Sequence, residues 1–242
     1  MRSIYDLSWG ETSFLAKLQL FFKSREQENR KIWSDSPQVQ AQGYSALAST
    51  CYSIVGTAFC QLKATFRPRW LSPMKIVVWC LTWLPLAAWC YWRMLPLSNQ
   101  IVKLIGYDGM SAAQCDVHQT ILRCYKRYDE ARMCILAALA KNPGEVHIRG
   151  LLHIGLARIY QHERAWVSMQ IELHKVIAEA PKAARENPRQ ATRIYRHCAD
   201  LLDQIGGGDR HTAADLRLEA KRLAEVTGAH DQLLKIKSGV CS

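Results

Sequence analysis

The sequence of 242 residues lacks the short motifs that mark the commonest classes of enzyme and metal-binding protein. It contains no H-E-x-x-H sequence, no pair of cysteines at C-x-x-C spacing, no P-loop and no G-x-S-x-G element. The glycine run Gly206–Gly208 is expected to follow a helix rather than a strand, so it predicts a turn and not a phosphate-binding loop. Because these patterns are missing, we expect no catalytic residues, no metal site and no cofactor, and hence no enzyme.

A dense basic tract is also missing, although the formal net charge is +11. Lysine and arginine are spread along the whole chain, and nucleic-acid binding is therefore not expected. The nine cysteines, an odd number, have no metal-type spacing. We interpret them as small buried thiols, which favours a reducing compartment.

Charged residues are also missing from one long apolar stretch of the sequence. Ile76–Trp92 holds no charged residue, and Lys75 and Arg93 flank it. A helix of this length spans about 26 Å, close to the hydrocarbon thickness of a bilayer, and the flanking side chains can extend toward the headgroups. We predict a transmembrane helix over residues 74–97, with a buried, aromatic-rich core helix as the alternative. The side chains expected at the membrane are Lys75, Trp79, Trp83, Trp89, Trp92 and Arg93.

Residues 1–73 are expected to form a basic, helical region close to the membrane. Residues 5–33 have an amphipathic pattern. Residues 44–62 carry no charge and many small side chains, so they predict either a second membrane helix or a soluble or interfacial one. The N-terminal flank of the 74–97 segment holds more basic residues than the C-terminal flank, which favours a single-pass protein with a cytosolic N-terminus. Residues 98–110 are interpreted as a linker.

From residue 111 onward the sequence predicts helices separated by short breaks, and one of these helices has a distinctive pattern. An aromatic residue is followed by a small residue, a large apolar residue, a second small residue and a proline, at steps of three, four, three and five positions. These residues are Tyr128, Ala131, Ile135, Ala138 and Pro143. The pattern resembles the second helix of a tetratricopeptide repeat (TPR). The resemblance implies antiparallel helix pairs that stack into an α-solenoid with a concave groove.

Two further units follow the same order less closely. The second helix of the next unit is expected over residues 165–180, ending at Pro181. A third pair is expected over 194–205 and 212–226, with a short capping helix near 231–237. The first helix of the first unit, 111–127, departs from the family pattern at Cys115, His118 and Gln119.

The sequence therefore predicts an all-α protein, in which TPR-like antiparallel helix pairs over residues 111–242 follow one transmembrane helix and N-terminal amphipathic helices. The resemblance implies a membrane-anchored adaptor or scaffold that binds another protein, such as an acidic peptide or helix, in its groove. The alternatives are a structural subunit of a larger membrane complex, and an enzyme or lipid-handling protein with an unrecognised site. The candidate groove residues lie on the first helix of each pair: His118, Arg123, Arg149, His153, Arg158, Tyr160, Arg193 and Arg196.

Overall fold

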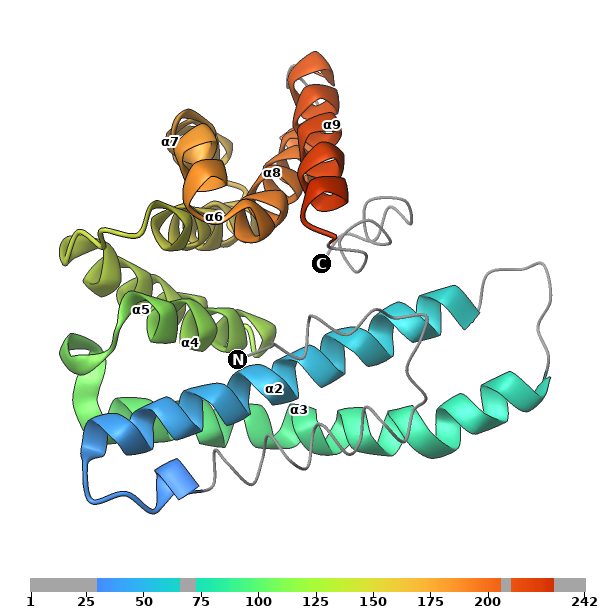
Figure 1. Ribbon diagram of the computed structural model, residues 1–242, viewed down its shortest axis with the longest axis vertical. Helices are drawn as coiled ribbons and strands as arrows, with labels where there is room; N and C mark the ends of the chain where they lie inside the picture. The colour runs from blue at the N-terminus through green and yellow to red at the C-terminus, as the bar shows by residue number, and fades with distance from the viewer. Residues whose placement is uncertain (1–29, 66–72, 206–209, 229–242) are drawn as a thin grey trace. The chain divides into compact units, whose positions relative to one another are not determined.

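The computed structural model of the protein describes residues 30–65, 73–205 and 210–228 (Figure 1). Side chains are described in these ranges except at 57, 59–65, 73–80, 82–83 and 210–211. All the regular elements in these ranges are helices and none is a strand, so the prediction of an all-α protein is confirmed. Most of the predicted 5–33 helix, the turn at 206–208 and the predicted 231–237 helix lie outside the described residues.

The described chain divides into two compact units, with the boundary between Met110 and Ser111. One unit holds two long helices, α2 (Pro37–Thr65) and α3 (Pro73–Gly109). The other holds α4 (Ala112–Cys124), α5 (Tyr128–Ala140), α6 (Val146–His162), α7 (Trp166–Glu186), α8 (Pro188–Leu202), the 3-10 turn η2 (Asp203–Ile205) and α9 (Arg210–Val226).

Helices α2 and α3 lie side by side as an antiparallel pair (Figure 1). The buried hydrophobic residues described on α2 are mostly small and recur at steps of three, four or seven positions: Ala41, Ala48, Cys51, Val55 and Ala58. Among the side chains described on α3, the buried ones are Cys90, Met94, Ser98 and Ile101. Because small side chains form most of the α2 side of this interface, α3 can approach the α2 backbone closely.

The remaining surface of α3 exposes large apolar side chains. They are Leu81, Leu84, Trp89, Tyr91 and Trp92, of which Leu81 is 73% exposed and Trp92 is 68% exposed. The guanidinium of Arg93 lies 6.0 Å from the centroid of the Trp92 ring, within the range of a cation–π contact. Helix α2 therefore buries mostly small side chains, and α3 presents several large apolar side chains outward.

The predicted transmembrane segment, 74–97, is part of α3, but α3 continues to Gly109. The residues interpreted as a linker, 98–110, thus belong mostly to this helix. Ser98 and Ile101 are buried, and the helix backbone kinks at Gly106 (φ 63°). Over the ranges that the structure describes, we find no helix long and apolar enough to span a membrane. The side chains of Lys75, Trp79 and Trp83 lie outside the described residues.

In the other unit, successive helices pack as pairs: α4 with α5, α6 with α7, and α8 with α9. The first helices of these pairs also contact one another in series, α4 with α6 and α6 with α8. Three of the residues that carry the family resemblance, Ala131, Ile135 and Ala138, are buried on α5. The largest fully buried side chains of this unit include Ile121, Leu122, Leu152, Ile159, Met169, Leu173, Ile194 and Leu201.

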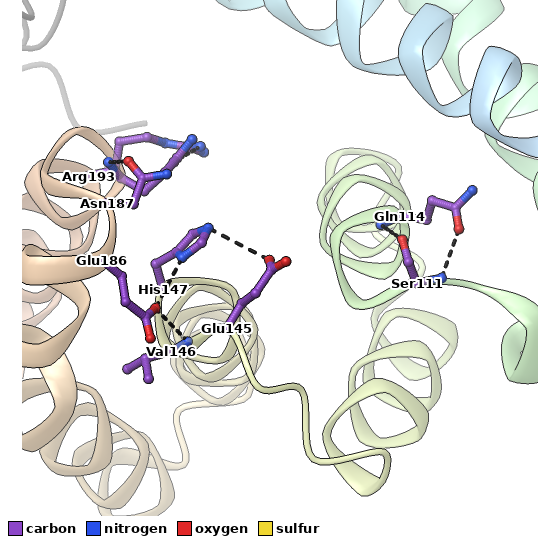
Figure 2. Close-up of polar contacts among 9 residues, drawn as sticks. Ser111, Gln114, Glu145, Val146, His147, Glu186, Asn187 and Arg193 are labelled. Carbon is purple, nitrogen blue, oxygen red and sulfur yellow. Dashed lines mark hydrogen bonds and ion pairs between the residues drawn. The ribbon is translucent and has the colours of Figure 1, made fainter.

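Side-chain caps fix several helix ends in this unit (Figure 2). Ser111 and Gln114 form a capping box at the start of α4, in which each side chain accepts the backbone N–H of the other, at 2.8 and 3.2 Å. At the start of α6, Glu186 Oε2 accepts the Val146 N–H at 2.9 Å and lies 3.5 Å from His147 Nδ1. A carboxylate at a helix N-terminus is favourable, and this one joins the end of α7 to the beginning of α6.

The end predicted for α7 at Pro181 is wrong, because the helix continues through this exposed proline to Glu186. The turn beyond Pro181 is held by burial of Ala183 and by the contact of Glu186 with α6. Asn187 follows the last residue of α7, and its side chain accepts the Gln190 N–H at 3.2 Å and caps α8. Helix α8 therefore begins at Pro188 rather than at 194.

Candidate functional site

Four arginines from α4, α6 and α8 surround His197, which is buried on α8. Arg158 Nη2 lies 2.8 Å from His197 Nδ1, and Arg196 Nη2 lies 3.4 Å from His197 Nε2. Arg123 and Arg193 are close enough for their charges to act on the same ring. Burial, and then the charges of these four arginines, hold the pKa of His197 well below its ordinary value of 6.5. The imidazole is therefore neutral at pH 7 and can accept a hydrogen bond from Arg158.

Three of these guanidinium groups, on Arg123, Arg158 and Arg193, are half-buried and are positioned by neutral acceptors. Arg123 Nε donates to Gln119 Oε1 at 2.7 Å, and Arg193 Nη1 donates to Gln190 Oε1 at 2.8 Å. Arg158 is oriented by the neutral imidazole described above. Since neutral acceptors orient a guanidinium without cancelling its charge, the three groups form a positively charged surface. We call Arg123, Arg158, Arg193, Arg196 and His197 the arginine cluster.

One carboxylate, that of Asp200, reaches the edge of the arginine cluster. Its oxygens lie 3.7 Å from Arg196 Nη1 and 4.0 Å from Arg217 Nη2. Burial raises the pKa of Asp200, and the charges of Arg196 and Arg217 partly oppose that rise. Arg217 also forms an ion pair with Asp203. The Asp200 carboxylate thus contacts one arginine of the cluster, Arg196, and one outside it, Arg217.

Two other predicted groove residues, Arg149 and His153, join α6 to α7. Arg149 forms a two-bond ion pair with Glu179, with both N–O distances 2.9 Å. His153 Nδ1 lies 2.5 Å from a carboxylate oxygen of Glu172, and the other oxygen accepts from Lys175 at 2.8 Å. Burial raises the pKa of Glu172, but the hydrogen bonds from His153 and Lys175 outweigh it, so the net shift is downward. Both side chains therefore bind carboxylates of the neighbouring helix, and they link α6 to α7.

The last two predicted groove residues, His118 and Tyr160, are also engaged within the fold. His118 is 1% exposed on α4, and its pKa is lowered to about 4, chiefly by burial and then by the charge of Arg127. Tyr160 is half-buried on α6, with the guanidinium of Arg132 5.7 Å from its ring centroid. Of the eight predicted residues, the structure therefore gathers four arginines, and the other four make contacts elsewhere.

The residues that position the arginines were missed in the sequence. Arg193 and His197, and likewise Arg196 and Asp200, are four residues apart on α8, so helical spacing was a usable signal for both pairs. Nothing local indicated that His197 would meet Arg158, because 39 residues separate them along the chain.

Among the side chains that the structure describes, no three His, Cys, Asp or Glu residues are placed to hold a metal ion. Comparisons of the chain with protein-family models, with characterised proteins and with solved structures find no match. The functional conclusion therefore depends on the residues and contacts described above.

Proposed function

We propose that this protein is an adaptor whose helical unit α4–α9 binds an acidic segment of another protein at the arginine cluster. The observation that carries the proposal is the gathering of four arginines from three different helices around one neutral histidine. The paired helices, and the serial contacts of α4, α6 and α8, support a TPR-like solenoid in which these three helices line one face.

An acidic protein segment fits this surface better than a neutral one. Guanidinium groups bind carboxylates through paired, charge-assisted hydrogen bonds, and three half-buried arginines present such donors together. Each such bond contributes about 1.5 kcal/mol or more where water is partly excluded, so a few of them give an affinity suited to a reversible adaptor.

The test is binding of a fluorescent glutamate-rich peptide, followed by anisotropy, to the full-length protein and two double variants. Arg158→Gln with Arg193→Gln removes two charges from the arginine cluster. Lys182→Gln with Arg185→Gln removes the same charge from exposed positions of α7. We expect the first variant to bind at least about 10-fold more weakly than the unaltered protein, and the second to bind almost normally. Equal weakening in both would show that only overall charge matters, and would refute the proposed site.

The second part of the proposal is attachment to a lipid bilayer through α2 and α3. The supporting observation is that α2 buries mainly small residues against α3, while Trp89 and Trp92 of α3 are exposed. Residues 36–62 and Ile76–Trp92 carry no charge, while basic Arg93 stands next to exposed Trp92. Exposed aromatic rings beside a basic side chain are suited to the boundary between lipid headgroups and acyl chains.

Flotation with liposomes tests this attachment. We expect the protein to float with vesicles that contain anionic lipid, and Trp92→Ser to reduce the floated fraction several-fold. Trp166→Ser is the matched control, because it removes a partly exposed tryptophan from α7 instead. An equal effect of both substitutions, or no flotation, would contradict lipid attachment through α3.

Protease protection in sealed membranes would test the expected cytosolic position of the N-terminus.

Purification in mild detergent separates the adaptor from the alternative, a structural subunit of a larger membrane complex. Exchangeable partners support the adaptor, and a stable stoichiometric assembly would favour the subunit.

A further inference from the structure

We propose that Cys115 and Cys134 form a redox-active dithiol, in which oxidation by hydrogen peroxide joins α4 to α5 through a disulfide. Neither residue belongs to the arginine cluster, so this modification site is independent of the proposed function. Three features support it: the contact between the two side chains, the difference in their acidity, and the place of their helices in the unit.

The first feature is that the two cysteines meet across the first helix pair. Cys115 lies on α4 and Cys134 lies on α5, two helices that pack together, and both side chains are fully buried. The two side chains form a hydrogen bond, and Cys134 Sγ lies 3.7 Å from the carbonyl oxygen of Cys115. Both thiols are free, so the structure shows the reduced pair. A disulfide therefore requires two side chains that are already in contact to bring their sulfurs to about 2 Å.

The second feature is that the two thiols differ in acidity. The hydrogen bond from Cys134 has the largest effect on Cys115 and lowers its pKa. Burial and the Asp116 carboxylate oppose this change, the charge of Lys141 adds to it, and the net shift is downward. The same hydrogen bond, and then burial, raise the pKa of Cys134. Cys115 is therefore the thiol that ionises first and becomes the nucleophile, while Cys134 keeps its proton.

The third feature is the place of α4 and α5 in the unit. Because both thiols are buried, an oxidant reaches them only when this helix pair opens locally. Among the described helices of the unit, the main contacts of α4 and α5 are with each other and with α6, whereas α6 also packs on α7 and α8. A helix pair at the end of such a series has fewer neighbours and opens more readily than a central one. Hydrogen peroxide is small and uncharged, so it needs a smaller opening than a peptide disulfide does.

The oxidation has two steps and consumes one molecule of peroxide. In the first step, the Cys115 thiolate attacks one peroxide oxygen. An S–O bond forms, the O–O bond breaks, and the departing hydroxide takes up the proton released from Cys115, which gives a sulfenic acid and water. In the second step, the Cys134 sulfur attacks the Cys115 sulfur. An S–S bond forms, the S–O bond breaks, and the second hydroxide leaves as water with the Cys134 proton. The two sulfurs lose two electrons, and peroxide is reduced to two molecules of water.

Mass spectrometry of the full-length protein tests the modification. The reduced protein is treated with hydrogen peroxide under native conditions, its remaining thiols are alkylated in denaturant, and it is digested with trypsin. Cleavage after lysine and arginine places the four cysteines of helices α4–α9 in different peptides: Cys115 in 104–123, Cys124 in 124–126, Cys134 in 133–141 and Cys198 in 197–210. We expect the peptides of Cys115 and Cys134 to be linked, with a mass two hydrogens below their sum. Cys198, which is buried on α8, is the internal control and should remain alkylated.

Three results of this experiment would overturn the proposal. The first is a disulfide that links exposed Cys124 instead of the proposed pair. The second is irreversible oxidation of Cys115 and Cys134 without a link between them. The third is full alkylation of both cysteines at a peroxide concentration that oxidises glutathione completely in the same tube.

Two serine variants test the roles of the two thiols. Cys134→Ser keeps a hydrogen-bond donor beside Cys115 but cannot form the disulfide, so the sulfenic acid of Cys115 should accumulate and react with dimedone. In Cys115→Ser, the label at Cys134 should be several-fold lower, because that thiol keeps its proton. Circular dichroism confirms that each variant is folded. Equal labelling of the two variants would show that Cys115 is not the nucleophile and would refute the mechanism.

Thermal unfolding followed by circular dichroism measures the consequence for the protein. The disulfide closes the loop that contains the α4–α5 turn and limits the separation of the two helices. Peroxide treatment should therefore raise the midpoint of unfolding of the unaltered protein by several degrees, and dithiothreitol should reverse the change. Cys134→Ser should show neither effect. An unchanged or lower midpoint in the cross-linked protein would show that the disulfide does not fit the packed helix pair, and the proposal would be wrong.

Discussion

Substitution of Gly155 by alanine tests whether α6 packs as closely on α4 and α5 as the structure shows. A Cβ atom at position 155 would lie 2.9 Å from Gln119 Oε1 and 3.0 Å from Ile135 Cδ1. Both distances are shorter than ordinary van der Waals contact, and Ile135 is fully buried. At least one of the two neighbouring side chains must therefore move.

Two opposing terms set the magnitude of the effect. Forcing one extra carbon into a packed core costs about 1–3 kcal/mol. Alanine in a helix interior is favoured over glycine by about 1 kcal/mol. The steric term is the larger, so Gly155→Ala should lower the free energy of unfolding by about 1 kcal/mol. Gly150→Ala on the same helix is the control, because its Cβ would meet Ile194 Cδ1 at 3.1 Å and has no second neighbour closer than 3.8 Å. Its two terms should nearly cancel.

The assay is urea unfolding of the full-length protein followed by circular dichroism, with both variants and the unaltered protein measured together. The expected order of stability is Gly155→Ala below Gly150→Ala, with the latter close to the unaltered protein. If Gly155→Ala is as stable as the unaltered protein or more stable, the packing of α6 against Gln119 and Ile135 is looser than described and the reasoning fails.

Three further predictions concern caps and buried charges. Glu172→Gln should lower the free energy of unfolding by about 1–3 kcal/mol, because His153 loses its charged partner. This difference should vanish at acid pH, where Glu172 is protonated in the unaltered protein. Urea unfolding at pH 7 and below pH 4 checks this, with exposed Glu225→Gln as the control. The pKa of His118 is about 4 in the folded protein and 6.5 in the unfolded chain, so the unfolded state binds more protons between these values. The free energy of unfolding should therefore fall by up to about 3 kcal/mol as the pH drops from 6.5 to 4. His118→Gln should reduce that fall in the same assay. Asn187→Ala removes the cap of α8 and should cost about 1 kcal/mol in thermal unfolding, whereas an increase in stability would contradict the capping role.

Helical spacing and turn residues in the sequence predicted the parts of the fold that are set by neighbouring residues. The aromatic, small and large apolar residues at Tyr128, Ala131, Ile135 and Ala138 indicated a helix, and α5 begins at Tyr128 with the last three buried. The break near Asn142 is present, with a positive φ of 47° at that residue. These predictions succeeded because helical spacing and turn residues act over a few positions.

Predictions that depended on distant contacts failed. Proline normally ends a helix, but α7 passes Pro181 because Ala183 is buried and Glu186 reaches the N-terminus of α6, 40 residues earlier in the chain. Residues 98–109, within the span interpreted as a linker, are helical for a similar reason. Ser98 and Ile101 are buried in the α2–α3 unit, so α3 continues past the proline at position 96.

The candidate site combines both kinds of information, and Gln119 shows how. The sequence marked Gln119 only as a departure from the repeat pattern, at a position where that family prefers a small residue. In the structure, Gly155 on α6 supplies the missing space, and Gln119 uses it to hold Arg123 at 2.7 Å. A residue as large as glutamine at 119 is thus compatible with close packing because the facing residue on α6 is a glycine. The same substitution that tests packing, Gly155→Ala, should therefore also displace Gln119 and weaken binding of acidic peptides through Arg123. Normal peptide affinity in a destabilised Gly155→Ala variant would show that Gln119 does not position Arg123 for binding.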